Sequence, residues 1–104
     1  MALIPFDDRD GSIWLDGEIV PWRDAKTHTL SHGLHYASMV FEGERVYSGR
    51  VFKGVEHTAR LRASANLLDF DVPIADAALE AAKLEVVQAN DITDGYVRAF
   101  CWRG

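Results

Sequence analysis

The sequence of 104 residues lacks several features that would each indicate a particular class of protein. It has one cysteine, Cys101, so no disulfide can form within the chain, and a lone thiol is typical of the reducing cytoplasm. Its formal net charge is −5 and it has no basic stripe, which argues against binding to nucleic acid or to an anionic membrane. Its apolar runs are far too short to cross a bilayer. What remains is the composition of one globular domain, with 48% hydrophobic residues.

Hydrophobic alternation and turn signals divide the chain into short strands, two long helices and a last strand. The predicted strands are 12–15, 18–22, 39–47, 50–53 and a final strand that begins near Gly95. The predicted helices are one turn at 34–38 and two longer helices at 55–68 and 76–89. This order predicts an α+β fold, in which the two longer helices pack on a largely antiparallel sheet.

Residue spacing predicts which face of each longer helix is apolar. In the helix at 55–68 the stripe consists of Val55, Ala59, Ala63 and Leu67. In the helix at 76–89 it consists of Leu79, Ala82, Val86 and Val87. A stripe of this kind is typically the face that a helix turns towards the core.

The strand at 39–47 separates two sets of side chains, because successive residues of a strand point to opposite faces. One face carries Met39, Phe41, Gly43, Arg45 and Tyr47, and the other carries Val40, Glu42, Glu44 and Val46. Glycine has no side chain, so another group can approach the first face at Gly43. The alternative is an ordinary half-buried strand, with Arg45 at its solvated edge.

The last strand repeats this arrangement. One face carries Tyr96, Arg98, Phe100 and Trp102, and the other carries Val97, Ala99 and Cys101. An aromatic face with one arginine suits a pocket for an anionic, partly apolar molecule, since guanidinium pairs bidentately with carboxylate. In the alternative, Arg98 pairs with an Asp or Glu within a core face. The small apolar face suits close packing against a helix, with Cys101 as inert core.

Two further sets of residues could bind ligands. His57, Arg60, Leu61 and Ser64 share one side of the helix at 55–68, where Arg60 could hold a phosphate or could belong to a solvated face. Three histidines, His28, His32 and His35, have a spacing that would let a helix present them together to zinc. The neighbouring Gly33 argues against a continuous helix there. We therefore expect these histidines to hydrogen-bond to the backbone near a turn, and we expect no metal.

Four ordered motifs together resemble the N-terminal part of the fold-type IV, pyridoxal-phosphate-dependent aminotransferases, most closely the branched-chain amino acid aminotransferases. The motifs are Ile13–Glu18, Ser31–Tyr36 followed by Val40–Arg45, Glu56–Leu61, and Tyr96–Arg98. The resemblance extends from about residue 12 to the end of the chain. It implies an N-terminal arm at 1–11 and the small domain of such an enzyme at 12–104, without the larger domain.

The resemblance implies a role for individual residues in binding the cofactor and the substrate. Arg60 would pair with the phosphate of pyridoxal 5′-phosphate. Phe41, Gly43 and Arg45 would line the pocket that takes the substrate side chain. These three residues share one face of the predicted strand at 39–47, which the motif match did not require.

Three more residues would complete the substrate site. Tyr96 would help to hold the α-carboxylate of the substrate. Arg98 would orient Tyr96, or would receive the distal carboxylate when glutamate binds. Tyr36 would reach into the pocket of another subunit, because the resemblance implies a homodimer or a larger assembly.

The implied reaction moves an amino group between branched-chain L-amino acids (Leu, Ile, Val) and 2-oxoglutarate. The lysine that holds the cofactor in this family lies in the larger domain, and it would therefore lie beyond Gly104. The lysines of this chain, Lys26, Lys53 and Lys83, match no family motif. We therefore expect a truncated domain with no catalytic residue of its own, inactive by itself. A last strand that runs almost to Gly104 agrees with this expectation.

Two kinds of alternative stay open. A D-amino-acid transaminase, an amine transaminase or an aminodeoxychorismate lyase would share this small domain. A non-catalytic binding or interaction domain could also keep the fold. In that case the aromatic face of Phe41, Tyr96, Phe100 and Trp102 would be an exposed patch, and we would expect the chain to self-associate.

Overall fold

The computed structural model describes residues 3–104, so the first two residues of the predicted arm at 1–11 lie outside it. Its strands are β1 (Ser12–Leu15), β2 (Glu18–Pro21), β3 (Met39–Tyr47), β4 (Arg50–Val51) and β5 (Gly95–Trp102). Its α-helices are α1 (His32–Tyr36), α2 (Gly54–Leu67) and α3 (Asp76–Ala89), and Trp22–Asp24 form a 3₁₀ turn. The strand pairs in this range are antiparallel, which confirms the predicted α+β fold. The boundary between arm and domain stays a prediction.

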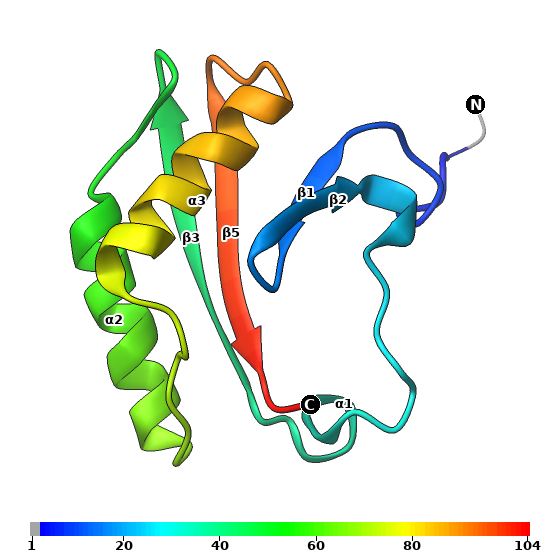
Figure 1. The fold of residues 1–104 in the computed structure, drawn as a ribbon, viewed down its shortest axis with the longest axis vertical. Helices are drawn as coiled ribbons and strands as arrows, with labels where there is room; N and C mark the ends of the chain where they lie inside the picture. The colour runs from blue at the N-terminus through cyan, green and yellow to red at the C-terminus, as the bar shows by residue number, and fades with distance from the viewer. Residues whose placement is uncertain (1–2) are drawn as a thin grey trace.

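The strands form a hairpin of β1 and β2 and a separate sheet with the order β4-β3-β5 (Figure 1). β3 pairs with β5 from Met39↔Trp102 to Val46↔Gly95. On its other side, β4 pairs only with Val46 and Tyr47. The part of β3 before Val46 therefore has an edge that no other strand of residues 3–104 covers.

Several predicted boundaries were wrong by a few residues. The second strand ends at Pro21, because the 3₁₀ turn begins at Trp22. The strand predicted at 50–53 ends at Val51, because Lys53 adopts a left-handed conformation with φ 56° where α2 begins. The turn predicted at 34–38 is α1, which begins earlier, at His32, and ends before Ala37, whose φ is also positive.

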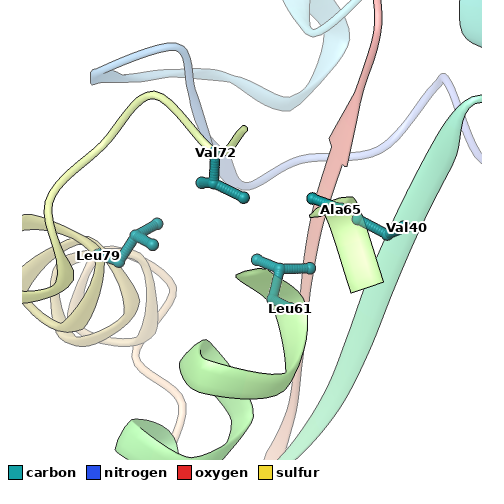
Figure 2. Close-up of a cluster of buried hydrophobic side chains, with 5 residues drawn as sticks. All are labelled: Val40, Leu61, Ala65, Val72 and Leu79. Carbon is teal, nitrogen blue, oxygen red and sulfur yellow. The ribbon is translucent and has the colours of Figure 1, made fainter. Parts of the chain in front are cut away.

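The helices α2 and α3 cover one face of the three-stranded sheet (Figure 1). The hydrophobic core lies between them and β3, and Figure 2 shows its buried members, Val40, Leu61, Ala65, Val72 and Leu79. Ala99 and Cys101 of β5 pack against this cluster. This confirms that the small apolar face of β5 meets a helix. Burial raises the pKa of the Cys101 thiol, as expected for an unreactive core cysteine.

The predicted core face of α2 was wrong. Its buried residues are Gly54, Thr58, Leu61 and Ala65. The predicted stripe faces solvent instead, and Val55 and Leu67 are 68% and 85% exposed. The phase differs by about one residue, or roughly 100° around the helix. The stripe predicted for α3 is confirmed, since Leu79, Ala82 and Val87 are buried and Val86 is half-buried.

Two sets of hydrogen bonds attach the remaining elements. The Asn90 side chain accepts from the Ser12 N–H and donates to the Ser12 carbonyl, both at 2.9 Å, which ties the hairpin to the end of α3. The Gly33 N–H donates to the Arg103 carbonyl at 2.8 Å, which ties α1 to the residue after β5. Within residues 3–104, none of the helices combines the length and apolar character needed to cross a membrane.

Candidate functional site

The face of the sheet turned away from α2, called here the outer face, carries the side chains predicted to form a pocket. It consists of Met39, Phe41, Gly43, Arg45 and Tyr47 of β3 and Tyr96, Arg98, Phe100 and Trp102 of β5. Facing pairs in the register are Phe41↔Phe100, Gly43↔Arg98 and Arg45↔Tyr96. The structure therefore brings five of the predicted substrate residues together on one surface: Phe41, Gly43, Arg45, Tyr96 and Arg98.

Arg98 packs its guanidinium on the ring of Phe41, with Cζ 3.9 Å from the ring centroid. No salt bridge to Arg98 is found among residues 3–104, so the alternative of an acidic partner was wrong. A guanidinium that stacks through its flat face keeps the N–H groups at its rim free. Arg98 is thereby fixed in position and can still bind an anion.

Gly43 accommodates the ring of Tyr96. A Cβ atom at Gly43 would lie 2.5 Å from Tyr96 Oη and 2.9 Å from Tyr96 Cε2, closer than carbon can approach. The expected approach of another group at this glycine is therefore confirmed, and the group is Tyr96. Any larger residue at Gly43 would displace the Tyr96 ring.

The uncovered edge of β3 presents backbone groups in the plane of the sheet, beside the outer face. The Phe52 N–H donates to the Arg45 carbonyl at 2.8 Å, so the backbone of Arg45 points towards the β4 side. In an antiparallel ladder, every second residue directs its N–H and C=O to the same side. Phe41 and Gly43 therefore direct theirs to the edge that β4 leaves unpaired.

A small apolar hollow of about 140 Å³ lies between α1 and one end of the outer face. Its lining residues are Thr27, Gly33, Leu34, Met39, Phe100 and Trp102. The hollow adjoins Phe41, because Phe41 faces Phe100 across the sheet. An aliphatic side chain is the kind of group that such a lining accepts.

Tyr36, on α1, is not brought to the outer face of its own chain. Its side chain is 73% exposed, and its ring lies 4.5 Å from that of His32, centroid to centroid. Its role in the pocket of another subunit stays a prediction.

Arg60 lies on the helix-covered side of the sheet and binds the carboxylate of Glu42. Its Nε and Nη2 donate to Oε2 and Oε1 of Glu42, both at 2.8 Å, and His57 Nδ1 lies 2.6 Å from the same Oε1. Glu42 is 4% exposed, whereas the Arg60 side chain is 68% exposed. The hydrogen bonds from Arg60 lower the pKa of Glu42, and the one from His57 adds to the effect. Glu42 therefore stays ionised and ties an otherwise solvated arginine to β3.

Glu44 lies on the same side of β3, deeper in the core, and faces Lys83 of α3. Lys83 Nζ donates to the Gly54 carbonyl at 2.9 Å, to Thr58 Oγ1 at 2.7 Å and to Glu80 Oε1 at 3.1 Å. These bonds use all the hydrogens of an ammonium group. Nζ also lies 2.7 Å from Glu44 Oε1, so four oxygens compete for three hydrogens, and Glu44 Oε2 has no hydrogen-bond partner among residues 3–104. Burial raises the pKa of Glu44, and Lys83 offsets this only in part.

The histidines near α1 are held by local hydrogen bonds. His28 Nδ1 accepts from the Leu30 N–H at 3.0 Å, and His35 Nε2 lies 2.7 Å from the Thr29 carbonyl, as predicted. The prediction was wrong for His32, whose Nδ1 pairs with the Ser38 hydroxyl at 2.5 Å. In the part of the chain that the structure describes, no group of three or more His, Cys, Asp and Glu side chains is arranged to hold a metal ion.

Sequence reasoning missed Glu42, Glu44 and Lys83. A signal was present, because both glutamates share the strand face of Val40 and Val46, which is otherwise apolar. Lys83 likewise falls four residues after Leu79, within the apolar stripe of α3. Charged residues at core positions of two elements predict a buried polar cluster, because isolated buried charges are too costly.

Comparison with known proteins gives one family model and a consistent set of relatives. Residues 39–104 match the model of the amino-transferase class IV family. The probable branched-chain-amino-acid aminotransferase of Rickettsia felis is 43% identical over 105 residues, covering 100% of this chain and 36% of its own length. The branched-chain-amino-acid aminotransferase of Pseudomonas aeruginosa is 41% identical over 93% of this chain and 33% of its own. The chain thus spans about a third of the length of these relatives.

Solved structures agree with the sequence matches. The branched-chain amino acid aminotransferase from Escherichia coli superposes with a TM-score of 0.86 at 39% identity, over 92% of this chain and 34% of that one. The T.th. branched-chain amino acid aminotransferase, complexed with N-(5′-phosphopyridoxyl)-L-glutamate, gives 0.85 at 41% identity, over 90% and 33%.

Proposed function

The chain belongs to the class IV aminotransferase family, and from this premise we propose that it supplies part of the active site of a branched-chain amino acid aminotransferase. The proposed enzyme uses pyridoxal 5′-phosphate and moves an amino group between leucine, isoleucine or valine and 2-oxoglutarate. One observation carries the proposal: Phe41, Gly43, Tyr96 and Arg98 converge on a surface that offers both an aromatic ring and a free guanidinium edge. Relatives that share 41–43% identity are named for this activity.

The donor set of this chain fits one end of the cofactor. Glu42 occupies two N–H groups of Arg60, and a guanidinium has five, so the exposed side of Arg60 retains donors for a phosphate. When bound, pyridoxal phosphate takes up the electron pair that is released at the amino acid Cα. We do not propose any lysine of this chain as the residue that holds the cofactor, and Lys83 is already paired with Glu44 in the core. We propose that the lysine lies in the remaining two thirds of the enzyme.

The outer face supports a double specificity for apolar and acidic side chains. Phe41 and the adjoining hollow can take an aliphatic side chain. The N–H groups at the rim of Arg98 can take the distal carboxylate of glutamate, while the Phe41 ring under the guanidinium keeps it in place. Tyr96, seated on Gly43, is within the same surface and can donate its hydroxyl to the α-carboxylate. Arg45 lies opposite Tyr96 and adds positive charge.

We further propose that the enzyme is a homodimer or a larger assembly in the cytoplasm. Exposed apolar side chains gather around α1, where Leu30, Leu34 and Tyr36 are 73%, 64% and 73% exposed. Such a cluster favours contact with another subunit. The lone cysteine supports a reducing compartment.

The test is the absorbance spectrum of the complete enzyme loaded with pyridoxal phosphate, recorded before and after leucine is added. We expect leucine to change the spectrum of the bound cofactor and 2-oxoglutarate to restore it. A response to D-alanine or to a simple amine, with none to leucine, would favour the other members of the family. No response to any amino donor would leave only a binding role.

Two variants connect this test to the residues. Arg60→Ala should weaken cofactor retention, and Phe41→Ala should change the preference among leucine, valine and glutamate. Arg23→Ala is the matched control, because Arg23 pairs with Asp8 and Asp10 on the surface and takes no part in the proposed site. Unchanged cofactor affinity in the Arg60 variant would remove Arg60 from its role.

A further inference from the structure

We propose that Glu42 is a positioning residue, which holds the guanidinium of Arg60 in one orientation so that its free donors meet the cofactor phosphate. His57 acts behind it by fixing the Glu42 carboxylate. This inference rests on the proposed function, because it takes the phosphate as the ligand of Arg60. It adds a residue on the core side of β3 to a site whose predicted substrate residues lie on the outer face.

The geometry makes Glu42 a rigid support. Its backbone lies in β3, paired with Ala99 of β5, and its side chain is 4% exposed. Each of its two oxygens accepts from Arg60 at 2.8 Å, and His57 Nδ1 lies 2.6 Å from one of them. Two parallel bonds between planar groups fix the plane of the guanidinium as well as its position. Arg60 is therefore oriented before any ligand arrives.

The need for such a support follows from the exposure of Arg60. Its side chain is 68% exposed, and without a partner a long side chain loses rotamer freedom when it binds a ligand. Glu42 fixes the Arg60 side chain when the protein folds, so the phosphate does not have to order this side chain when it binds. Uncovered N–H groups of Arg60 face away from Glu42, where an anion can accept from them.

The charge of Glu42 has an effect on phosphate binding that opposes the effect of positioning. The negative charge of Glu42 offsets the attraction between Arg60 and a phosphate, so removal of Glu42 could strengthen binding. At a solvated site this long-range term is reduced by water and salt. The orientation of the Arg60 side chain, in contrast, does not depend on screening. We therefore expect the positioning effect to be the larger. The two effects predict opposite changes in affinity for the phosphate when Glu42 is removed.

The experiment compares pyridoxal 5′-phosphate with pyridoxal, which lacks the phosphate, by titrating the cofactor-free complete enzyme and following protein fluorescence. Glu42→Gln should weaken binding of pyridoxal phosphate by roughly three- to tenfold, the effect of releasing one ordered side chain, and leave pyridoxal unchanged. Arg60→Ala should weaken the binding of pyridoxal phosphate at least as much as Glu42→Gln does. In the double variant the loss should equal that of Arg60→Ala alone, because Glu42 acts through Arg60. Glu85→Gln, an exposed glutamate on α3, is the matched control and should change neither affinity.

Three results would overturn the proposal. Glu42→Gln could weaken the binding of both ligands equally, which would indicate a merely structural role. It could strengthen the binding of pyridoxal phosphate, which would indicate that charge dominates. In the double variant, the loss of affinity from Glu42→Gln could add to the loss from Arg60→Ala. If Glu42→Gln does not fold, Glu42→Asp keeps the charge but is too short to reach both partners, and the same phosphate-selective loss is expected.

The design separates this inference from the proposed function. If Arg60→Ala loses phosphate selectivity and the Glu42 variants do not, positioning by Glu42 fails while the aminotransferase proposal stands. If the unmodified enzyme binds pyridoxal phosphate no better than pyridoxal, the proposed function fails as well.

Discussion

Glu42 and Glu44 lie on the same side of the same strand, and the structure gives them opposite environments. Arg60 and His57 reach Glu42 from the solvent-facing part of α2 and lower its pKa. Glu44 is 0% exposed and faces Lys83, and burial raises its pKa in spite of that contact. One carboxylate is stabilised in its charged form, and the other is penalised for being charged.

The difference follows from the hydrogen bonds available at each position. Glu42 receives three, and both partners keep contact with solvent, since the Arg60 side chain is 68% and the His57 side chain 21% exposed. Glu44 has only Lys83, at 2.7 Å from Oε1, and Lys83 also donates to Gly54, Thr58 and Glu80, so Glu44 Oε2 is left without a partner among the described residues. A nearby opposite charge offsets the cost of burying a carboxylate only when further hydrogen bonds satisfy its remaining lone pairs. Glu42 is therefore the candidate for a functional role, and Glu44 belongs to the core.

The largest expected effect comes from breaking the Glu44 contact. Lys83→Met removes the cation paired with Glu44 and should lower the free energy of unfolding by about 3–5 kcal/mol, since an uncompensated buried charge remains. Urea unfolding of the chain measures this loss. In the double variant with Glu44→Leu we expect most of the stability to return, because apolar residues can replace a buried pair. A double variant as unstable as Lys83→Met alone would show that Lys83 serves its other partners, not Glu44.

A smaller effect is expected at Gly43, which lies between the two glutamates and faces the other way. Gly43→Ala places a Cβ atom 2.5 Å from Tyr96 Oη, but Tyr96 is 54% exposed and can turn aside, so the cost in stability should be about 0.5 kcal/mol. Thermal unfolding measures the loss of stability. In the complete enzyme the same change should raise KM for the amino acid more than it weakens the cofactor, because it moves Tyr96 and leaves Glu42 and Arg60 in place. Equal effects on KM for the amino acid and on cofactor affinity would mean that the two sides of β3 are not independent.

The sequence predicted the elements that depend on local pattern. The bounds of β3 and α3 were predicted correctly, because strict alternation and a long helical stripe are strong signals. β4 was predicted too long, since the left-handed Lys53 that ends it leaves no mark in a hydrophobic pattern. The phase of α2 was wrong because its buried face includes Gly54 and Thr58, which pattern rules do not count as core. These small residues bring the backbone and hydroxyl of α2 within reach of Lys83.

The outer face was predictable for a similar reason. Period-two alternation assigned Phe41 and Arg98 to their faces, and the register of two neighbouring strands then brought them together. The partners of Glu42 and Glu44 were not predictable in this way. Arg60 and Lys83 lie far along the chain, and only the packing of α2 and α3 on β3 brings them to the carboxylates.

The contrast between the two carboxylates is tested most directly by the pH dependence of unfolding in Glu42→Gln and Glu44→Gln, each compared with the unmodified chain. The pKa of Glu42 is lowered in the folded state, so its stabilising contribution is present above the ordinary value of 4.5 and is lost as the pH falls below it. The pKa of Glu44 is raised, so its contribution is greatest below 4.5 and is lost as the pH rises through the folded value. A carboxyl whose pKa differs by one between the folded and unfolded chain changes the free energy of unfolding by about 1.4 kcal/mol.

Urea unfolding between pH 3 and pH 7 therefore gives two curves of opposite slope. The advantage of the unmodified chain over Glu42→Gln should grow as the pH rises, whereas its advantage over Glu44→Gln should shrink. Two curves with the same slope would contradict the account, because they would mean that the fold treats both carboxylates alike.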